Sequence, residues 1–301
     1  MVAELTRWVT GIGHIVISHI HQNIPIKLNK TYERIGMEIV KDGEAKKMLY
    51  QGRILGFLMS FVFFGAILYG VYRMRNRQIR PIAGLTAMEE AVGRAVEMGK
   101  PVHECPGGGG LSGEYAQQST AAIAILGHVA RLCASRGARL MVSCHVVQLL
   151  PPVTEMVRQS YMREGAQAQY SDDIVTYAVG QQALMAYTMG MFEREKIAAN
   201  IMVGPYFWEA IVLAEAGGAV GAMQVGGTAR QSQLPAFVAA CDYLLIGDEL
   251  YAAAAMISED KGQIGSIGGQ DVVRAVISAL LIAGLIAALM GSKLIFSLIG
   301  I

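Results

Sequence analysis

The feature that most constrains this chain is an uncharged hydrophobic segment from Ile54 to Tyr72. Its 19 residues, ILGFLMSFVFFGAILYGVY, would form a helix roughly 28 Å long, which matches the hydrocarbon core of a bilayer. A core helix of that length in a soluble protein would normally keep a polar face, and this segment has none. The segment therefore predicts a transmembrane helix at 54–72.

A second hydrophobic segment lies near the C-terminal end, from Ala275 to Gly291, and is followed by an apolar tail, residues 292–301. Its sequence, AVISALLIAGLIAALMG, is slightly short but long enough to span a bilayer. The whole chain is 53% hydrophobic and 16% charged with a mean hydropathy of +0.40, which is too apolar for an ordinary soluble protein. We therefore expect a multi-pass membrane protein with a second transmembrane helix at 275–291.

Weaker signals predict the side of the membrane on which the intervening residues lie. Basic residues are balanced around the first segment, whereas Lys261 and Arg274 outnumber Lys293 across the second. The four cysteines form neither a disulfide framework nor a CxxC pair, which fits a reducing compartment. We expect a cytoplasmic domain at the cell membrane. Because the net charge is only +1, no nucleic-acid partner is predicted.

The N-terminal leader, residues 1–50, carries an amphipathic pattern. Its apolar side chains share one helical face: Leu5, Trp8, Val9, Ile12, Ile15, Val16 and Ile20. Such a face predicts a segment that lies in the membrane interface, or one that packs on a partner or on another copy of the chain. Both interpretations stay open.

Residues 80–262 alternate between short apolar runs and helical patterns. The apolar runs predict strands at 101–105, 139–144, 173–178, 199–204, 219–225 and 242–247. A capping box of Thr86 and Glu89 predicts a first helix at 87–98. Further helices are predicted at 116–136, 152–164, 180–195, 206–216, 231–240 and 248–257. This alternation is typical of an α/β domain with a doubly wound, mostly parallel sheet of about six strands.

A glycine-rich segment follows the first predicted strand, and Gly108, Gly110 and Gly113 satisfy the spacing GxGxxG. Exposed backbone amides and the start of the next helix can hold a phosphate or carboxylate, so these glycines are candidate anion or nucleotide ligands. A dinucleotide site also needs an acidic residue after the second strand, where the sequence has Ser143, Cys144 and His145. The alternative is a glycine segment that serves close chain packing or a subunit contact.

A second glycine pair, Gly226 and Gly227, is expected directly after the fifth strand, followed by Thr228 and Arg230. These residues are further candidates for an anion or cofactor site, because Thr and Arg side chains donate hydrogen bonds to anions. The alternative is a strand-to-helix turn in which Thr228 is a cap.

Cysteine and histidine residues meet at the predicted ends of the first two strands: His103 and Cys105, then Cys144 and His145. The residue types suit zinc, but neighbouring residues of a strand point to opposite faces and no ligand spacing supports a site, so no metal is predicted. A nucleophilic thiol is a second interpretation, with Cys105, His103 and His145 as candidate catalytic residues. Cysteines that pack as small apolar groups are the favoured interpretation.

The sequence from AMEEAVGRAVEMGKPVHECPGGGGLSG through EREKIAANIMVGPYFWEAIVLAEAGG to QLPAFVAACDYLLIGDELYAAAAMISED and GSIGGQD resembles a known family. The family consists of bacterial and archaeal membrane-anchored domains of unknown function, and the resemblance covers about residues 80–274. It implies a membrane-tethered α/β domain and brings no catalytic residue, cofactor or substrate with it.

We therefore expect a non-enzymatic membrane component that self-associates as a scaffold, with a possible anion or nucleotide site at the glycine-rich strand ends. Two alternatives remain open. One is a membrane-tethered hydrolase or transferase that uses a Cys/His pair, and the other is an accessory subunit of a larger membrane complex. The expected partners are the lipid bilayer and either further copies of the chain or other membrane subunits.

Overall fold

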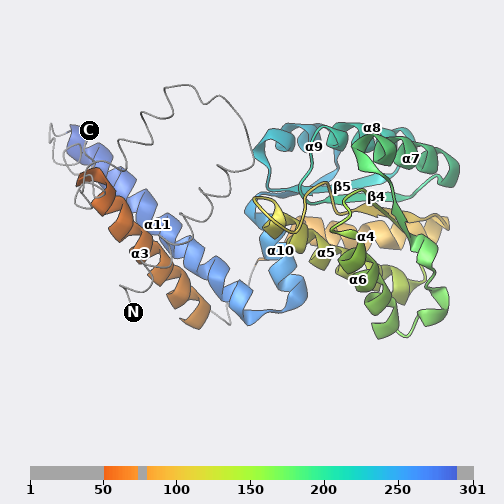
Figure 1. Cartoon of the computed structure of the whole chain (residues 1–301), viewed down its shortest axis with the longest axis horizontal. Coiled ribbons are helices and arrows are strands. Elements are labelled where there is room, and N and C mark those ends of the chain that lie inside the picture. Colours follow the sequence, from red (N-terminus) through yellow and green to blue (C-terminus); the bar gives the residue numbers. More distant parts are fainter. Residues whose placement is uncertain (1–50, 74–79, 290–301) are drawn as a thin grey trace, which may run out of the picture. The chain divides into compact units, whose positions relative to one another are not determined.

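The computed structural model describes residues 51–73 and 80–289 of the chain (Figure 1). The predicted amphipathic leader, 1–50, and the apolar tail, 292–301, lie outside the described residues. Residues 59–292 form one compact unit, which contains the α/β domain.

The domain is built on a six-stranded sheet in which all strands are parallel. The strands are β1 (Val102–Cys105), β2 (Leu140–Cys144), β3 (Val175–Tyr177), β4 (Ala199–Val203), β5 (Met223–Thr228) and β6 (Tyr243–Ile246). Their order in the sheet is β3-β2-β1-β4-β5-β6, so the chain winds outward twice from the centre. The prediction of an α/β fold with a parallel six-stranded sheet is confirmed.

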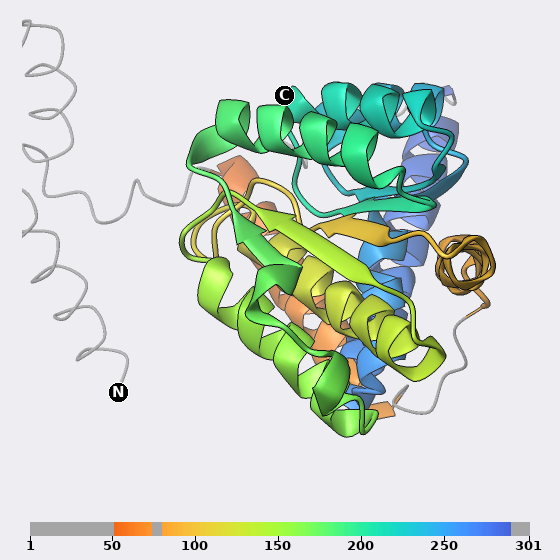
Figure 2. The same cartoon turned by 90° about the vertical axis from the view of Figure 1, so that its right-hand side faces the viewer.

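Helices cover both faces of the sheet, as Figures 1 and 2 show. One face packs against α4 (Ala83–Met98), α5 (Ala116–Arg136), α6 (Leu150–Arg163) and α10 (Asp248–Ser258). The other packs against α7 (Gly180–Glu195), α8 (Glu209–Ala219) and α9 (Leu234–Ala240). Every residue of β1 and β4 is buried, because helices cover both faces of these central strands.

Several predicted bounds are wrong. α8 runs to Ala219, where the fifth strand was predicted to begin, and β5 begins only at Met223. α4 begins at Ala83, a turn before the predicted start, so Thr86 and Glu89 lie inside the helix and its N-cap, Ile82, makes no side-chain cap. β5 continues to Thr228 and does not end at residue 225, because Gly226 and Gly227 remain paired with β4 and β6.

The second hydrophobic segment belongs to a longer helix than predicted, α11 (Lys261–Leu289). Among the described residues, only its span Lys261–Ile286 is both long and apolar enough to cross a membrane, with a mean hydropathy of 1.7. The polar residues 261–274 therefore continue in one helix with the apolar ones. The first hydrophobic segment lies in α3 (Gln51–Arg73), in which Ser60–Arg73 is a shorter apolar helix.

Glycines bring the backbones of α3 and α11 into direct contact. A Cβ atom at Gly265 would lie 2.7 Å from the carbonyl oxygen of Gly70, and one at Gly269 would lie 2.8 Å from Cα of Ile67. A Cβ atom at Gly70 would overlap Gly269 itself. Small residues allow this approach, which is the usual way in which apolar helices pack without side chains between them.

Candidate ligand site at the carboxyl edge of the sheet

The centre of the sheet is a topological switch point. β1 and β4 are neighbours, and the chain leaves them in opposite directions, toward α5 on one face and α8 on the other. In open parallel sheets, ligands bind outside the carboxyl ends of the strands at such a point. Two segments meet there: residues 106–115 after β1 and residues 204–208 after β4.

These two segments pack directly on one another. The N–H of Gly108 donates a hydrogen bond of 2.7 Å to the carbonyl of Pro205. A Cβ atom at Gly107 would lie 2.6 Å from the same oxygen, and one at Gly204 would overlap the carbonyl of Pro106. Gly107 and Gly204 also have positive φ angles of 83° and 144°. Close chain packing therefore explains these two glycines.

The later part of the glycine-rich segment is more open. A Cβ atom at Gly113 would meet nothing within 4 Å, and this residue has a φ of 79°. Leu111 N–H donates a hydrogen bond of 3.2 Å to Gln148 Oε1, and a Cβ atom at Gly110 would lie 2.7 Å from that oxygen. Of the three candidate glycines, Gly113 therefore has the most space beside it.

Gly108 itself lies between two titratable side chains. A Cβ atom here would be 3.1 Å from His145 Nε2 and 3.0 Å from Glu209 Oε1. Burial lowers the pKa of His145 and raises the pKa of Glu209. His145 Nδ1 is buried and has no hydrogen-bond partner among the described residues. Two groups with shifted pKa values at a switch point are typical of a functional site.

Hydrogen bonds hold the Glu209 carboxylate in place. Oε1 accepts from the N–H of Phe207 at 3.1 Å, and Oε2 accepts from the amide of Gln181 at 3.1 Å. Gln181 in turn accepts from the indole N–H of Trp208 at 3.1 Å. Glu209 was not predicted as a site residue, because its position against Gly108 depends on β1 and β4 being neighbours.

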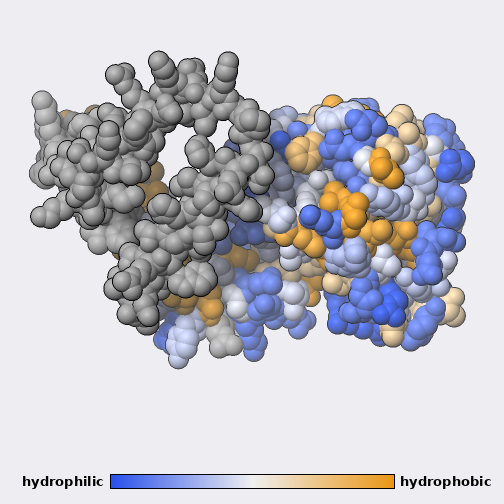
Figure 3. Space-filling model, in the orientation of Figure 1, coloured by the Kyte–Doolittle hydropathy of each residue, from blue (hydrophilic) through white to orange (hydrophobic). Residues whose placement is uncertain are grey.

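Exposed apolar side chains lie at the same edge of the sheet, one in each segment that follows β1 to β4. Their exposed fractions are 42% for Leu111, 67% for Val147, 80% for Val179 and 51% for Trp208. We call these four residues the apolar rim. Hydrophobic patches also interrupt the largely hydrophilic surface of the domain in Figure 3. Apolar walls with a few fixed polar groups are typical of small-molecule sites.

The candidate catalytic residue His103 does not pair with a cysteine, as a Cys/His nucleophile would require; it is bonded to Ser143 and Asn200. His103 Nε2 lies 2.7 Å from Ser143 Oγ and His103 Nδ1 lies 2.8 Å from Asn200 Oδ1. The chain of bonds continues from Asn200 Nδ2 to Gln224 Oε1 at 2.7 Å. Burial lowers the pKa of His103 to about 4, although the bond to Asn200 opposes the shift. The four hydrogen-bonded side chains, His103, Ser143, Asn200 and Gln224, are all buried. They therefore connect neighbouring strands and do not face solvent.

The two cysteines at the ends of β1 and β2, Cys105 and Cys144, are buried thiols rather than exposed nucleophiles. Cys105 has no exposed surface, and burial raises its pKa. Burial also raises the pKa of Cys144 to about 11, and its Sγ lies 3.5 Å from the carbonyl oxygen of Val146. A reactive thiol needs the opposite shift. Within the described ranges, no group of three or more His, Cys, Asp or Glu residues is arranged to hold a metal ion.

The second set of candidate ligands is buried within β5. A Cβ atom at Gly226 would overlap Phe237, and one at Gly227 would lie 3.1 Å from Leu245 Cβ. Thr228 Oγ1 accepts the N–H of Arg230 at 3.2 Å, as expected of a turn. The alternative of a strand-to-helix turn with a cap is wrong in two points: Gly226 and Gly227 lie within the strand, and no side chain caps the helical segments that follow. A ligand role for these residues stays a prediction.

The guanidinium of Arg230 lies over two aromatic rings. Its Cζ is 4.1 Å from the centre of the Phe207 ring and 5.4 Å from that of Tyr115. One of its nitrogens donates a hydrogen bond of 3.3 Å to the carbonyl of Tyr206. These contacts fix a positive charge beside the glycine-rich segment.

A family model described as a domain of unknown function (DUF6754) matches residues 44–299. The match includes both hydrophobic segments and thus extends beyond the resemblance traced over residues 80–274. No curated protein and no solved structure matches the chain.

Proposed function

We propose a binding function for this chain, which belongs to the family of the domain of unknown function DUF6754. Its α/β domain binds a nucleoside or nucleotide at the carboxyl edge of the sheet, as a membrane-anchored component that is not an enzyme. The observation that carries this proposal is the pair of half-buried His145 and buried Glu209 against Gly108, at the sheet edge that also carries the apolar rim.

The electrostatics of the cluster indicate which part of the ligand lies there. A carboxylate beside Gly108 repels a phosphate but accepts hydrogen bonds from hydroxyl or amino groups, as a ribose or a base presents them. His145 Nδ1 offers a further polar atom without a partner. A phosphate belongs farther along the segment, near Gly113 and the charge of Arg230. The apolar rim suits the flat face of a base.

A thermal-unfolding experiment on the full chain in mild detergent tests the proposal. Adenosine, ATP and inorganic phosphate are the probes, and the nucleoside or nucleotide should raise the unfolding midpoint. Gly108→Ala places a methyl group against His145 and Glu209 and should abolish the shift. Gly93→Ala is the matched control, since its Cβ atom would make only an ordinary contact, 3.6 Å from Arg136. No shift at millimolar probe, or an equal shift in Gly108→Ala, would reject the site.

Membrane anchoring by both helices is part of the proposal. α11 is long and apolar enough to span, and its backbone contact with α3 at Gly70 supports α3 as the second span. We expect the chain to resist alkaline carbonate extraction. We also expect protease added from the cytoplasmic side to cleave within 82–260 and to leave residues 1–50 protected. Cleavage of both regions from the same side would contradict two spans.

Self-association is the second candidate function. Apolar side chains are exposed on the helical layer formed by α7, α8 and α9: Met189 at 44%, Ile211 at 47% and Val238 at 59%. Exposed apolar patches mark contact surfaces. Mass measurement of the purified chain in mild detergent should give an integral multiple of 32.3 kDa that is at least twofold, after correction for detergent. A monomer would reject self-association, and a co-purified subunit would favour the accessory-subunit alternative.

A further inference from the structure

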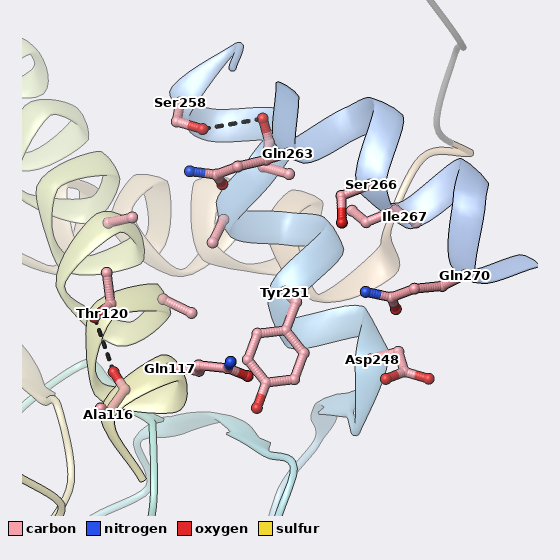
Figure 4. Close-up of a pocket in the computed structure, with 14 residues that line it drawn as sticks. Ala116, Gln117, Thr120, Asp248, Tyr251, Ser258, Gln263, Ser266, Ile267 and Gln270 are labelled. Carbon is pink, nitrogen blue, oxygen red and sulfur yellow. Dashed lines mark hydrogen bonds between the residues drawn. The ribbon is translucent and has the colours of Figure 1, made fainter. Parts of the chain in front are cut away.

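A cavity of about 570 Å³ lies away from the cluster at Gly108, with walls from α5, α10 and α11 (Figure 4). Its volume is within the ~300–1,000 Å³ typical of small-molecule sites. The cavity has space because small alanine side chains line it on two helices. They are Ala121 and Ala124 on α5, and Ala254 and Ala255 on α10. They provide an apolar surface on one part of the wall.

The remaining wall is rich in uncharged polar side chains. They are Gln117 and Thr120 on α5, Tyr251 and Ser258 on α10, and Gln263, Ser266 and Gln270 on α11. The Gln117, Tyr251, Gln263 and Gln270 side chains come from all three helices, as Figure 4 shows. Across residues 80–289, none of these four side chains makes a hydrogen bond to the protein. Their amide and hydroxyl groups are therefore free to bind a ligand.

The cavity has no charge available for an ionic ligand. Asp248 is its one charged lining residue, and it is ion-paired with Arg274, which lies one turn after Asp271 on α11. No lysine, arginine or histidine is among the lining residues. A phosphate or carboxylate would lack a counter-charge here, whereas hydroxyl groups match amides and hydroxyls as both donors and acceptors.

We propose that this cavity binds an uncharged polyhydroxylated group of the size of a hexose or disaccharide. Its hydroxyl groups bond to Gln117, Tyr251, Gln263 and Gln270, and its C–H face lies on the alanines. Two sources share this chemistry, a free sugar and the headgroup of a glycolipid. The second is relevant because Gln270 is only about 7.5 Å along α11 from Ala275, where the uncharged apolar run begins. This site is separate from the one proposed at Gly108.

The test uses the full chain purified in a zwitterionic detergent that has no sugar headgroup. Maltose is the probe for a free sugar, and an alkyl maltoside below its micelle concentration is the probe for a lipid-linked headgroup. Binding raises the unfolding midpoint, and a titration of the midpoint gives the affinity. A response to maltose assigns a free sugar, and a response to the maltoside alone assigns a headgroup.

Substitutions of lining residues distinguish binding in the cavity from unspecific effects of the probes on the unfolding midpoint. Gln270→Ala should weaken binding about tenfold, because the loss of one amide leaves a ligand hydroxyl unsatisfied. Gln169→Ala is the control, since Gln169 is exposed and lies outside the lining. Tyr251→Phe removes only a hydroxyl group and should weaken binding without unfolding the domain. The proposal fails if neither probe shifts the midpoint, or if Gln270→Ala and Tyr251→Phe bind as tightly as the unchanged chain.

Discussion

Asn200 and His103 form a buried hydrogen bond across the two central strands, with 2.8 Å between Oδ1 and Nδ1. The strands β4 and β1 that carry them are 97 residues apart in the chain and neighbours in the sheet. Because Asn200 Oδ1 can only accept, the imidazole holds its proton on Nδ1, and Nε2 then accepts from Ser143. An imidazolium could donate the same bond, so it is burial that keeps the ring neutral and lets Nε2 accept.

Burial of a neutral His103 predicts an acid-sensitive contribution to stability. The pKa of His103 is about 4 in the fold against 6.5 in the unfolded chain. Between these values the unfolded state binds more protons, so the free energy of unfolding falls as pH decreases from 6.5 toward 4. The loss is about 3 kcal/mol for the completed shift.

The measurement is the unfolding midpoint of the full chain in detergent over this pH range. His103→Gln cannot titrate, so it should be less stable at neutral pH but lose less stability on acidification. If the variant and the unchanged chain show parallel pH profiles, the assignment to His103 is wrong.

Glu104 predicts the opposite dependence on pH. Both of its carboxyl oxygens are buried without a hydrogen-bond partner among the described residues, and burial raises its pKa well above 4.5. Above pH 4.5 the folded state therefore binds more protons at this site than the unfolded state, and stability falls as pH rises. Glu104→Gln should thus stabilise the chain by about 1–3 kcal/mol at neutral pH.

The gain from Glu104→Gln should shrink as pH falls toward 4.5, where the unfolded carboxyl group is also protonated. Chemical or thermal unfolding at several pH values measures it. Glu155→Gln is the control: this carboxylate is exposed on α6 and paired with Arg158, so a change of less than about 1 kcal/mol is expected. A destabilised Glu104→Gln protein at neutral pH would mean that the buried carboxylate has an essential partner.

Periodicity predicted the elements well but could not predict which elements would be neighbours. The helices at 116–136 and 180–195 begin and end as expected, and all six strands are present. The contact of Glu209 with Gly108 and the bond of Asn200 to His103 both depend on β4 lying beside β1, which alternation alone does not specify. The start of α4 was misplaced because a capping pattern inside a helix has the same sequence as one at its end.

Gly226 was predicted as a ligand residue, but its close neighbours indicate a role in packing β5 against α9. A substitution can measure how much this packing contributes to stability. A Cβ atom there would overlap the Phe237 ring and lie 2.8 Å from Cys241 Sγ. Gly226→Ala should therefore destabilise the domain by about 1–3 kcal/mol through overpacking. Gly93→Ala on the exposed part of α4 should be neutral or stabilise by up to about 1 kcal/mol. Equal midpoints for the two variants would show that β5 and α9 are not in contact at this position.

The contact between α3 and α11 can be tested directly, because the chain supplies a matched pair of glycines on α3. Gly70 touches the backbone of α11 at Gly269, whereas a Cβ atom at Gly65 would meet nothing within 4 Å. Gly70→Ala should separate the helices and lower the unfolding midpoint in detergent, at a cost of about 1–3 kcal/mol. Gly65→Ala changes helix propensity in the same way without touching α11, so it should leave the midpoint unchanged or raise it. If both substitutions have the same effect, α3 does not pack on α11 through Gly70, and the support for α3 as a second span is lost.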